Sequence, residues 1–225
     1  MLALNKHLGQ CRLMRALAVG VFLLVILSAP RPVWSEKQSF ELEGIVISAE
    51  HGGIRLLDAW GRGSRQDPFT VVEEIHDDGP AILTIRNLDT SFGNPRYVGH
   101  TVGFVLKKIV TNRTRQPWTL FVMELREALG KESGYYDGLS FGQANSRVGY
   151  VLSDRYVTID INDEPIDAIH FQGATINPGE TVQMQIAITD HSPQTTFYLL
   201  QRRPIRLANP ALPQPPRSRQ PPSRG

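Results

Sequence analysis

Cysteine is nearly absent from this sequence, because Cys11 is the only one among 225 residues. Cys11 precedes an uncharged apolar run, so a chain cleaved after that run would contain no cysteine. Disulfide bonds, a thiolate nucleophile and a cysteine-ligated metal are then excluded from the mature chain. A mature chain of roughly 190 residues can bury enough apolar surface to fold without such cross-links.

Acidic residues are missing from the first 35 positions, which carry four Lys and Arg residues. The apolar run between Arg15 and Arg31 is shorter than the roughly 18 residues that indicate a membrane-spanning helix. A basic start, a short apolar centre and small residues after it are typical of a secretory signal. We therefore predict a signal peptide over residues 1–35, cleaved after Ser35 or, alternatively, after Ala29, and no membrane span after cleavage. An uncleaved N-terminal anchor is the competing interpretation.

Long helical patterns and internal repeats of 20–50 residues are also missing. The clearest pattern is a period of two over Thr181–Thr189, where apolar residues alternate with mostly polar ones, as in a half-buried strand. Asn177–Glu180, with the sequence N-P-G-E, stands directly before it and predicts a reversal of the chain. A preceding strand is expected to end near Ile176.

Short apolar or alternating segments between turn residues predict strands along the rest of the mature chain. These strands are Ser39–Ser48, Ile54–Leu57, Phe69–Ile75, Ala81–Asn87, Thr101–Val110, Trp118–Leu125, Tyr150–Leu152, Arg155–Ile161, Ala168–Gln172 and Thr195–Gln201. Asp77–Pro80 predicts a hairpin turn, and Asn162–Asp167 predicts an acidic turn. Glu124–Leu129 predicts a helical turn, and either a long loop or short irregular strands are expected over Gly130–Tyr150.

Many short strands with closely spaced turns predict an all-β fold, an antiparallel β-sandwich of immunoglobulin-like or jelly-roll-like type. We expect this sandwich to span residues 36–203. Residues 36–95 either form a separate small β unit or belong to the same sandwich, and we favour one continuous structure.

Charge is divided unevenly along the chain. Residues 36–200 contain 14 Lys and Arg against 22 Asp and Glu, a net charge of −8. Residues 201–225 contain six Arg and no acid, a net charge of +6. An acidic domain does not favour nucleic-acid binding. The Pro- and Arg-rich residues 204–225 predict a disordered tail, which is either merely solvated or in contact with acidic polymers or anionic surfaces.

Several strand–turn–strand signatures between Val102 and Arg203 recur in a known order. They are V-T-N-R-T from Val110, P-W-T from Pro117, D-G-L-S-F from Asp137, S-D-R-Y from Ser153, D-A-I-H-F from Asp167, N-P-G-E-T-V from Asn177 and F-Y-L-L-Q-R from Phe197. In this order the segment resembles the β-sandwich ectodomains of exosortase-sorted (PEP-CTERM-type) proteins and bacterial immunoglobulin-like domains. The resemblance implies an exported bacterial protein and no established chemistry. The sorting tail of that family is absent here.

Oxygen-bearing side chains cluster in one predicted turn: Asp160, Asn162, Asp163 and Glu164, with Asp167 close by. Calcium prefers six to eight oxygen ligands, so this turn together with a neighbouring loop could bind it. The glycine and the bidentate Glu of an EF-hand loop are missing. The alternative is a solvated hairpin turn that ends at Pro165.

Tyr135, Tyr136 and Asp137 form the second candidate site, a loop platform on which sugar rings could stack. Trp118 either joins this platform or belongs to the core. Asn112 begins an N-glycosylation sequon, N-R-T, which we expect to remain unmodified because the resemblance is bacterial.

Catalytic patterns are missing, since no G-x-S-x-G motif and no closely spaced histidine pair occurs in the mature chain. We therefore expect no enzyme, no catalytic residue and no cofactor. The expected function is that of a secreted or periplasmic structural, adhesion or scaffold component of the envelope or extracellular matrix, with envelope or matrix polymers as partners. The alternative is a carbohydrate- or calcium-dependent binding module.

Overall fold

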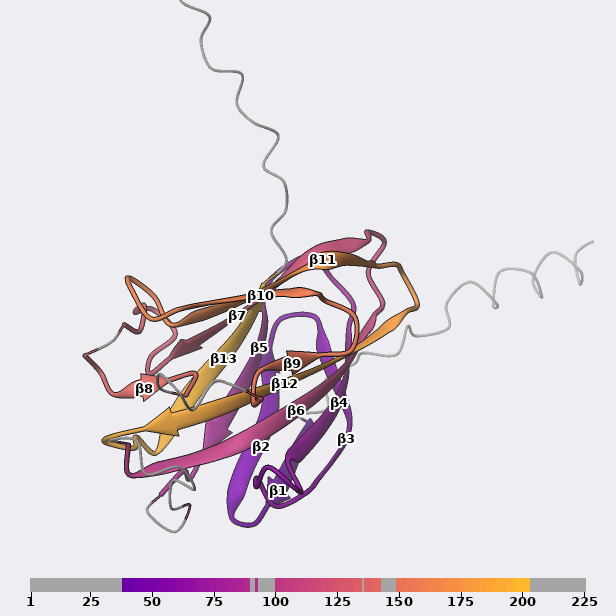
Figure 1. Cartoon of the computed structure of the whole chain (residues 1–225). Coiled ribbons are helices and arrows are strands. Elements are labelled where there is room, and N and C mark those ends of the chain that lie inside the picture. Colours follow the sequence, from indigo (N-terminus) through magenta and orange to yellow (C-terminus); the bar gives the residue numbers. More distant parts are fainter. Residues whose placement is uncertain (1–37, 90–91, 93–99, 135, 143–148, 203–225) are drawn as a thin grey trace, which may run out of the picture. The chain divides into compact units, whose positions relative to one another are not determined.

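The computed structural model describes residues 38–89, 92, 100–134, 136–142 and 149–202. Thirteen β-strands and no helix make up the regular structure of these residues, which confirms the predicted all-β class. The strands form two sheets that share one apolar core, an arrangement consistent with a β-sandwich. Figure 1 shows the long strands β6 and β12 lying side by side in one of these sheets.

The larger sheet has seven strands, and every neighbouring pair in it is antiparallel. Its strand order is β1 (Gln38–Leu42), β2 (Ile45–His51), β5 (Ala81–Arg86), β13 (Thr196–Arg202), β7 (Trp118–Arg126), β11 (Ala168–Ile176) and β10 (Thr158–Asn162). The last strand of the described residues, β13, therefore lies in the middle of this sheet, between β5 and β7.

The smaller sheet has six strands. Its order is β3 (Ile54–Trp60), β4 (Phe69–Ile75), β6 (Val102–Asn112), β12 (Thr181–Asp190) and β8 (Leu139–Ser140), and β9 (Leu152–Ser153) also pairs with β12. The pair β4–β6 is parallel, so the expectation of a purely antiparallel fold is wrong at this point. A parallel pair needs a long crossover. Here the chain supplies it by passing through β5, in the other sheet, between β4 and β6.

The alternation of apolar residues decides which side chains fill the core. In β12 the predicted strand is confirmed, and the core side chains are Val182, Met184, Ile186 and Ile188. Phe121, Met123 and Leu125 of β7 enter the same core from the larger sheet. In both sheets, large apolar side chains at alternate positions point into the core, so each sheet covers the apolar face of the other.

The segment predicted as one strand over Ser39–Ser48 is instead a hairpin of β1 and β2. Leu42 pairs with Ile45 across a two-residue turn made by Glu43 and Gly44. Both turn residues have positive φ, 49° at Glu43 and 92° at Gly44. Such a turn matches the twist of two antiparallel strands, which explains why the chain reverses here.

The predicted hairpin at Asp77–Pro80 is also wrong. This turn does not join paired strands, because β4 belongs to the smaller sheet and β5 to the larger one. The predicted helical turn at Glu124–Leu129 is replaced by the end of β7, where Arg126 pairs with Tyr198 of β13. Strand β7 pairs with β13 on one side and with β11 on the other. This pairing satisfies its backbone hydrogen-bonding groups and so favours the extended form.

Strands from residues 36–95 pair with strands from later in the chain. From residues 36–95, β5 pairs with β13 and β4 pairs with β6, so the two sheets each combine early and late segments. The predicted signal peptide, residues 1–35, and the predicted tail, residues 204–225, lie outside the described residues. No helix in the described part of the chain is long and apolar enough to cross a bilayer.

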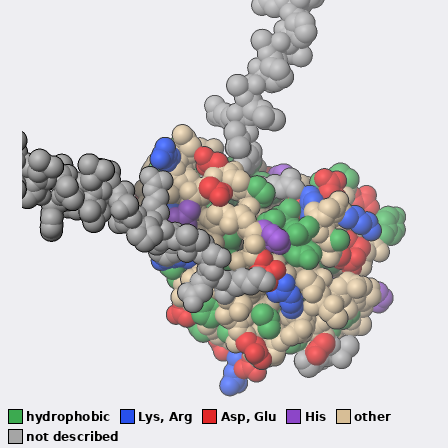
Figure 2. Space-filling model, turned by 180° about the vertical axis from the view of Figure 1, so that it is seen from behind, with side chains coloured by type: hydrophobic (Ala, Val, Ile, Leu, Met, Phe, Trp, Pro, Cys, Tyr) green, Lys and Arg blue, Asp and Glu red, His purple; other side chains and the backbone are tan. Residues whose placement is uncertain are grey.

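One charged pair lies inside the core. Lys108 of β6 and Glu73 of β4 point between the sheets, with Nζ 2.7 Å from Oε2 and neither side chain exposed. On the face drawn in Figure 2, by contrast, acidic and basic side chains are interspersed among hydrophobic and other polar ones. The described residues of that face thus show no large area of a single charge.

Candidate functional site

The two sites predicted from the sequence meet at one end of the sandwich. The loop after β7 lies against the turn between β10 and β11, because the Asp167 amide donates to the Ser133 carbonyl at 2.9 Å. The Gly134 backbone approaches Pro165 so closely that an added Cβ would lie 3.1 Å from the Pro165 carbonyl oxygen. The candidate sugar platform and the candidate calcium turn are therefore neighbours, which the sequence alone did not predict.

Tyr136 is the most exposed aromatic side chain in the described residues, at 93 %. The next residue, Asp137, fixes the loop: its carboxylate accepts hydrogen bonds from the Ser133 hydroxyl and from the Leu139 amide, the latter at 3.2 Å. Gly138 follows with a φ of 94°, which completes the turn. The ring of Tyr136 is thus presented to solvent from an ordered loop. Tyr135 lies outside the described residues.

Trp118 does not take part in this platform. Its side chain is buried, its ring centroid lies 5.5 Å from that of Phe121, and its indole N–H donates to the Thr114 hydroxyl at 3.3 Å. Of the two interpretations given for Trp118, the core role is therefore the one that the structure shows.

Two further carboxylates join Asp137 at this end of the molecule. Burial raises the pKa of Glu127, and the charges of Asp137 and Asp190 raise it further against the opposing effect of Lys131. Burial likewise raises the pKa of Asp190, although the Ser192 amide, which donates to its Oδ1 at 2.8 Å, acts in the opposite direction. Glu127 and Asp190 both sense the charge of Asp137 and are easier to protonate than free carboxyl groups.

Histidine and hydroxyl groups lie beside Asp190. The Nδ1 atom of His100 is 3.0 Å from the Thr189 hydroxyl, and burial lowers the pKa of His100. The rings of His100 and His191 lie 6.3 Å apart between centroids. The end of the sandwich thus combines an exposed aromatic ring with carboxylate, imidazole and hydroxyl groups, the set of groups that hydrogen-bonds sugar hydroxyls.

Sequence reasoning missed Glu127 and Asp190. Glu127 lies within the predicted helical turn, and Asp190 directly follows a predicted strand. Their proximity depends on the ends of β7 and β12 meeting the same loop, which is a tertiary relationship. The one available signal was that both acids border segments with strong strand character.

The four residues predicted to bind calcium are spread over a strand and a turn. Asp160 lies within β10, where its carboxylate accepts a hydrogen bond from the Gln172 amide of β11, and Asn162 ends the strand opposite Ala168. Asp163 and Glu164 lie in the turn itself. No group of three or more His, Cys, Asp or Glu side chains in the described ranges is placed to hold a metal ion. Calcium binding here stays a prediction.

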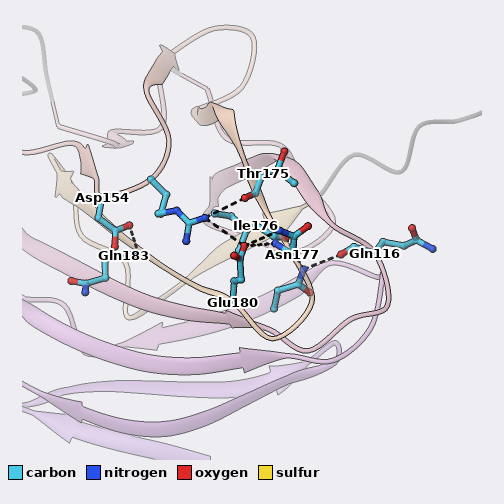
Figure 3. A network of polar contacts seen from close by, with 9 residues as sticks. Gln116, Asp154, Thr175, Ile176, Asn177, Glu180 and Gln183 are labelled. Carbon is cyan, nitrogen blue, oxygen red and sulfur yellow. Dashed lines mark hydrogen bonds and ion pairs between the residues drawn. The ribbon is translucent and has the colours of Figure 1, made fainter.

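The sequon asparagine, Asn112, is fully buried. Its Nδ2 donates to the carbonyls of Gln116 and Ile176, two residues labelled in Figure 3, at 2.9 and 3.0 Å. Its Oδ1 accepts from the Thr114 amide at 2.9 Å. One amide hydrogen thus binds the loop after β6, and the other joins Asn112 to the end of β11. In the folded protein this asparagine is inaccessible to a glycosylating enzyme.

Polar contacts beside this asparagine fix the turn between β11 and β12. The Glu180 carboxylate accepts from the Asn177 amide at 2.7 Å and lies 3.4 Å from the Arg155 guanidinium, and these contacts hold the pKa of Glu180 below its usual range (Figure 3). Asp154 accepts from the Gln183 amide at 2.8 Å. These contacts tie the loop after β9 to β12, so we assign them a structural role.

Comparison with known proteins gives no relative: no family model, no curated protein and no solved structure matches the chain. The function is therefore inferred from the chemistry of the described residues.

Proposed function

We propose that this chain is an exported, non-enzymatic adhesion or scaffold module of the cell envelope or extracellular matrix. It attaches to carbohydrate polymers through the loops at the Tyr136 end of the sandwich. The signal-like residues 1–35 support export into the periplasm or the medium. We further propose an immunoglobulin-like or jelly-roll-like sandwich, which is supported by a chain that passes repeatedly between two layers.

The observation that carries this proposal is the exposure of Tyr136 on a loop fixed by its neighbour. A flat aromatic ring binds the apolar face of a sugar ring, and nearby polar groups accept its hydroxyl hydrogens. Because Asp137 already fixes the loop through Ser133 and Leu139, little conformational freedom is lost when a ligand binds.

A glycan array followed by polysaccharide pull-down tests the binding. We expect Tyr136→Ala to remove retention on the bound polymer without changing the melting temperature, since this ring is solvent-exposed. Val157→Ala is the matched control, because Val157 is another strongly exposed apolar side chain and lies at the other end of β10 from the acidic turn. Equal retention of the two variants would contradict the role of Tyr136.

Export is tested separately by fractionating the expressing cells and sequencing the N-terminus of the product. We expect the chain outside the cytoplasm with a start at Glu36 or Pro30. A cytoplasmic product that starts at Met1 would contradict export and leave the glycan experiment unaffected.

A further inference from the structure

The outward face of β3, β4 and β6 carries a second set of groups that the loop site does not use. Strand register places Trp60 beside Thr70 and Lys107 in one row across this face. A second row, four residues further along β4, joins Arg55, Glu74 and Thr111. Four residues of strand separate the two rows by about 13 Å.

Three basic side chains surround Glu74 on this face. The Glu74 carboxylate lies 2.8 Å from Arg113 Nε, 3.3 Å from Arg55 Nη2 and 3.3 Å from His76 Nε2. Burial raises the pKa of Glu74, but the hydrogen bond and charge of Arg113, with the charges of Arg55 and His76, outweigh it and leave the pKa lowered. One carboxylate thus faces two permanent positive charges, so the Glu74 cluster keeps a positive excess.

Arg113 is fixed at one edge of its guanidinium group and exposed at the other, where an anion could bind. Its Nε atom donates to Glu74, and its backbone amide donates to the Ile75 carbonyl at 2.9 Å. The side chain is still 49 % exposed, and in the part of the chain that the structure describes its guanidinium is bound by Glu74 through this edge. The two Nη groups at the outer end suit a bidentate bond to a carboxylate or sulfate.

Trp60 supplies an aromatic surface in the other row. Its indole is 46 % exposed at the end of the edge strand β3. Asp58 lies between the Trp60 row and the Arg55 row, opposite Val72, and its Oδ1 accepts the Ala59 amide at 2.8 Å. A sugar polymer that reaches from the indole to the Glu74 cluster would pass this carboxylate.

The charge of the whole domain does not prevent an anion from binding here. Residues 36–200 carry a net charge of −8, but charges further away than about 8 Å are largely screened at physiological ionic strength. The local positive excess around Glu74 therefore dominates the electrostatics of this face, and its attraction for an anion weakens at high salt.

We propose that this face binds an acidic polysaccharide, whose sugar rings stack on Trp60 while its carboxylate or sulfate groups bind Arg113 and the Glu74 cluster. The proposal is independent of the Tyr136 loops, because none of its residues belongs to them. It also names the chemistry of the ligand, an anionic sugar polymer, which the loop site leaves open.

Binding of purified full chain to immobilised polygalacturonate tests it, with neutral dextran and phosphatidylglycerol vesicles as the other two surfaces. We expect retention on polygalacturonate that weakens with salt, and little on dextran. Trp60→Ala and Arg113→Gln should each weaken binding by about tenfold, the scale of one charged hydrogen bond or one stacked ring. Asp58→Asn should strengthen binding, because it removes a repelling charge and keeps Oδ1.

Arg155→Gln is the matched control, since Arg155 is likewise a partly exposed arginine that contacts a glutamate, Glu180, at 3.4 Å but lies in a different loop. It should bind as the unmodified chain does, and so should Tyr136→Ala, which separates this face from the loop site. Thermal melts check that every variant is folded. Absence of binding to polygalacturonate, equal binding by Arg113→Gln and Arg155→Gln, or binding to the vesicles alone would each overturn the proposal.

Discussion

Lys108 and Glu73 form an ion pair with Nζ 2.7 Å from Oε2, and both side chains lie wholly inside the sandwich. They come from β6 and β4, the parallel pair of the smaller sheet. Burial lowers the pKa of Lys108, whereas Glu73 opposes that change through its charge and its hydrogen bond. Within the described residues Glu73 Oε1 has no hydrogen-bond partner, so the pair is incompletely satisfied.

Removing one member of this pair should cost far more stability than removing both. Lys108→Met leaves a carboxyl group alone in the core and should lower the free energy of unfolding by about 3–5 kcal/mol. The double variant Lys108→Met with Glu73→Leu should recover most of that loss or exceed the original stability, because apolar groups of similar size need no partner. Urea unfolding at pH 7 measures all three chains. A double variant as unstable as the single one would contradict this explanation.

Glu127 should make the protein less stable as the pH rises. Its pKa is raised by burial and by the charges of Asp137 and Asp190, so its proton is bound more tightly in the folded chain. That contribution is fully present below the unfolded pKa, at about pH 4, and is lost as the pH rises through the folded pKa. Glu127→Gln should therefore raise the melting temperature at pH 7 and change it little at pH 4.

Glu41→Gln serves as the control for this comparison, because Glu41 is an exposed residue of β1 in the other part of the larger sheet. Melting curves between pH 4 and pH 8 should show a growing difference between the two variants. A difference that stays constant with pH would mean that the Glu127 charge does not oppose folding.

Two glycines test the turn between β1 and β2. An added Cβ meets nothing within 4 Å at Gly44 or at Gly130, but only Gly44 has a positive φ, 92°. Gly44→Ala should therefore cost about 1–2 kcal/mol through backbone strain alone. Gly130→Ala should be neutral or stabilising by up to about 1 kcal/mol. Equal urea midpoints for the two variants would show that the left-handed turn is not needed.

Asn112 should remain unmodified even in a cell that glycosylates exported proteins. The folded state buries it, and its amide hydrogens bind two carbonyls. Intact mass of the chain secreted from a eukaryotic host checks this. Asn112→Asp should lower the free energy of unfolding by about 2–4 kcal/mol, because it replaces an amide nitrogen that donates two hydrogen bonds by an oxygen that can only accept them. The control Asn162→Asp alters an exposed residue and should change stability little.

The sequence contained more of the fold than of the site. The alternation in β12 and the turn at Asn177–Glu180 depend on neighbouring residues, so pattern reasoning found both. The missed turn at Glu43 and Gly44 left a trace as well: the apolar positions change from even to odd numbers between Leu42 and Ile45, which an uninterrupted strand does not do.

The buried Lys108–Glu73 pair is also partly visible in the alternation of apolar residues in the sequence. Lys108 shares the alternation of Phe104, Leu106 and Val110, which are core residues. A lysine at such a position needs a buried partner. Which acid supplies it depends on the pairing of β4 with β6, and no local pattern specifies that pairing. The same holds for Glu127 and Asp190, which lie 63 residues apart in the sequence and come together only in the folded chain.

The central place of β13 has a consequence for biosynthesis. Because β13, the last strand of the described residues, lies between β5 and β7, a chain released before Thr196 leaves one edge of β5 and one edge of β7 unpaired, and β13 covers both edges in the finished protein. The ribosome must therefore complete nearly the whole polypeptide before the larger sheet can close. A chain that cannot finish folding early stays available to export machinery that accepts only unfolded substrates, and premature stop codons before Thr196 should yield aggregates rather than folded fragments.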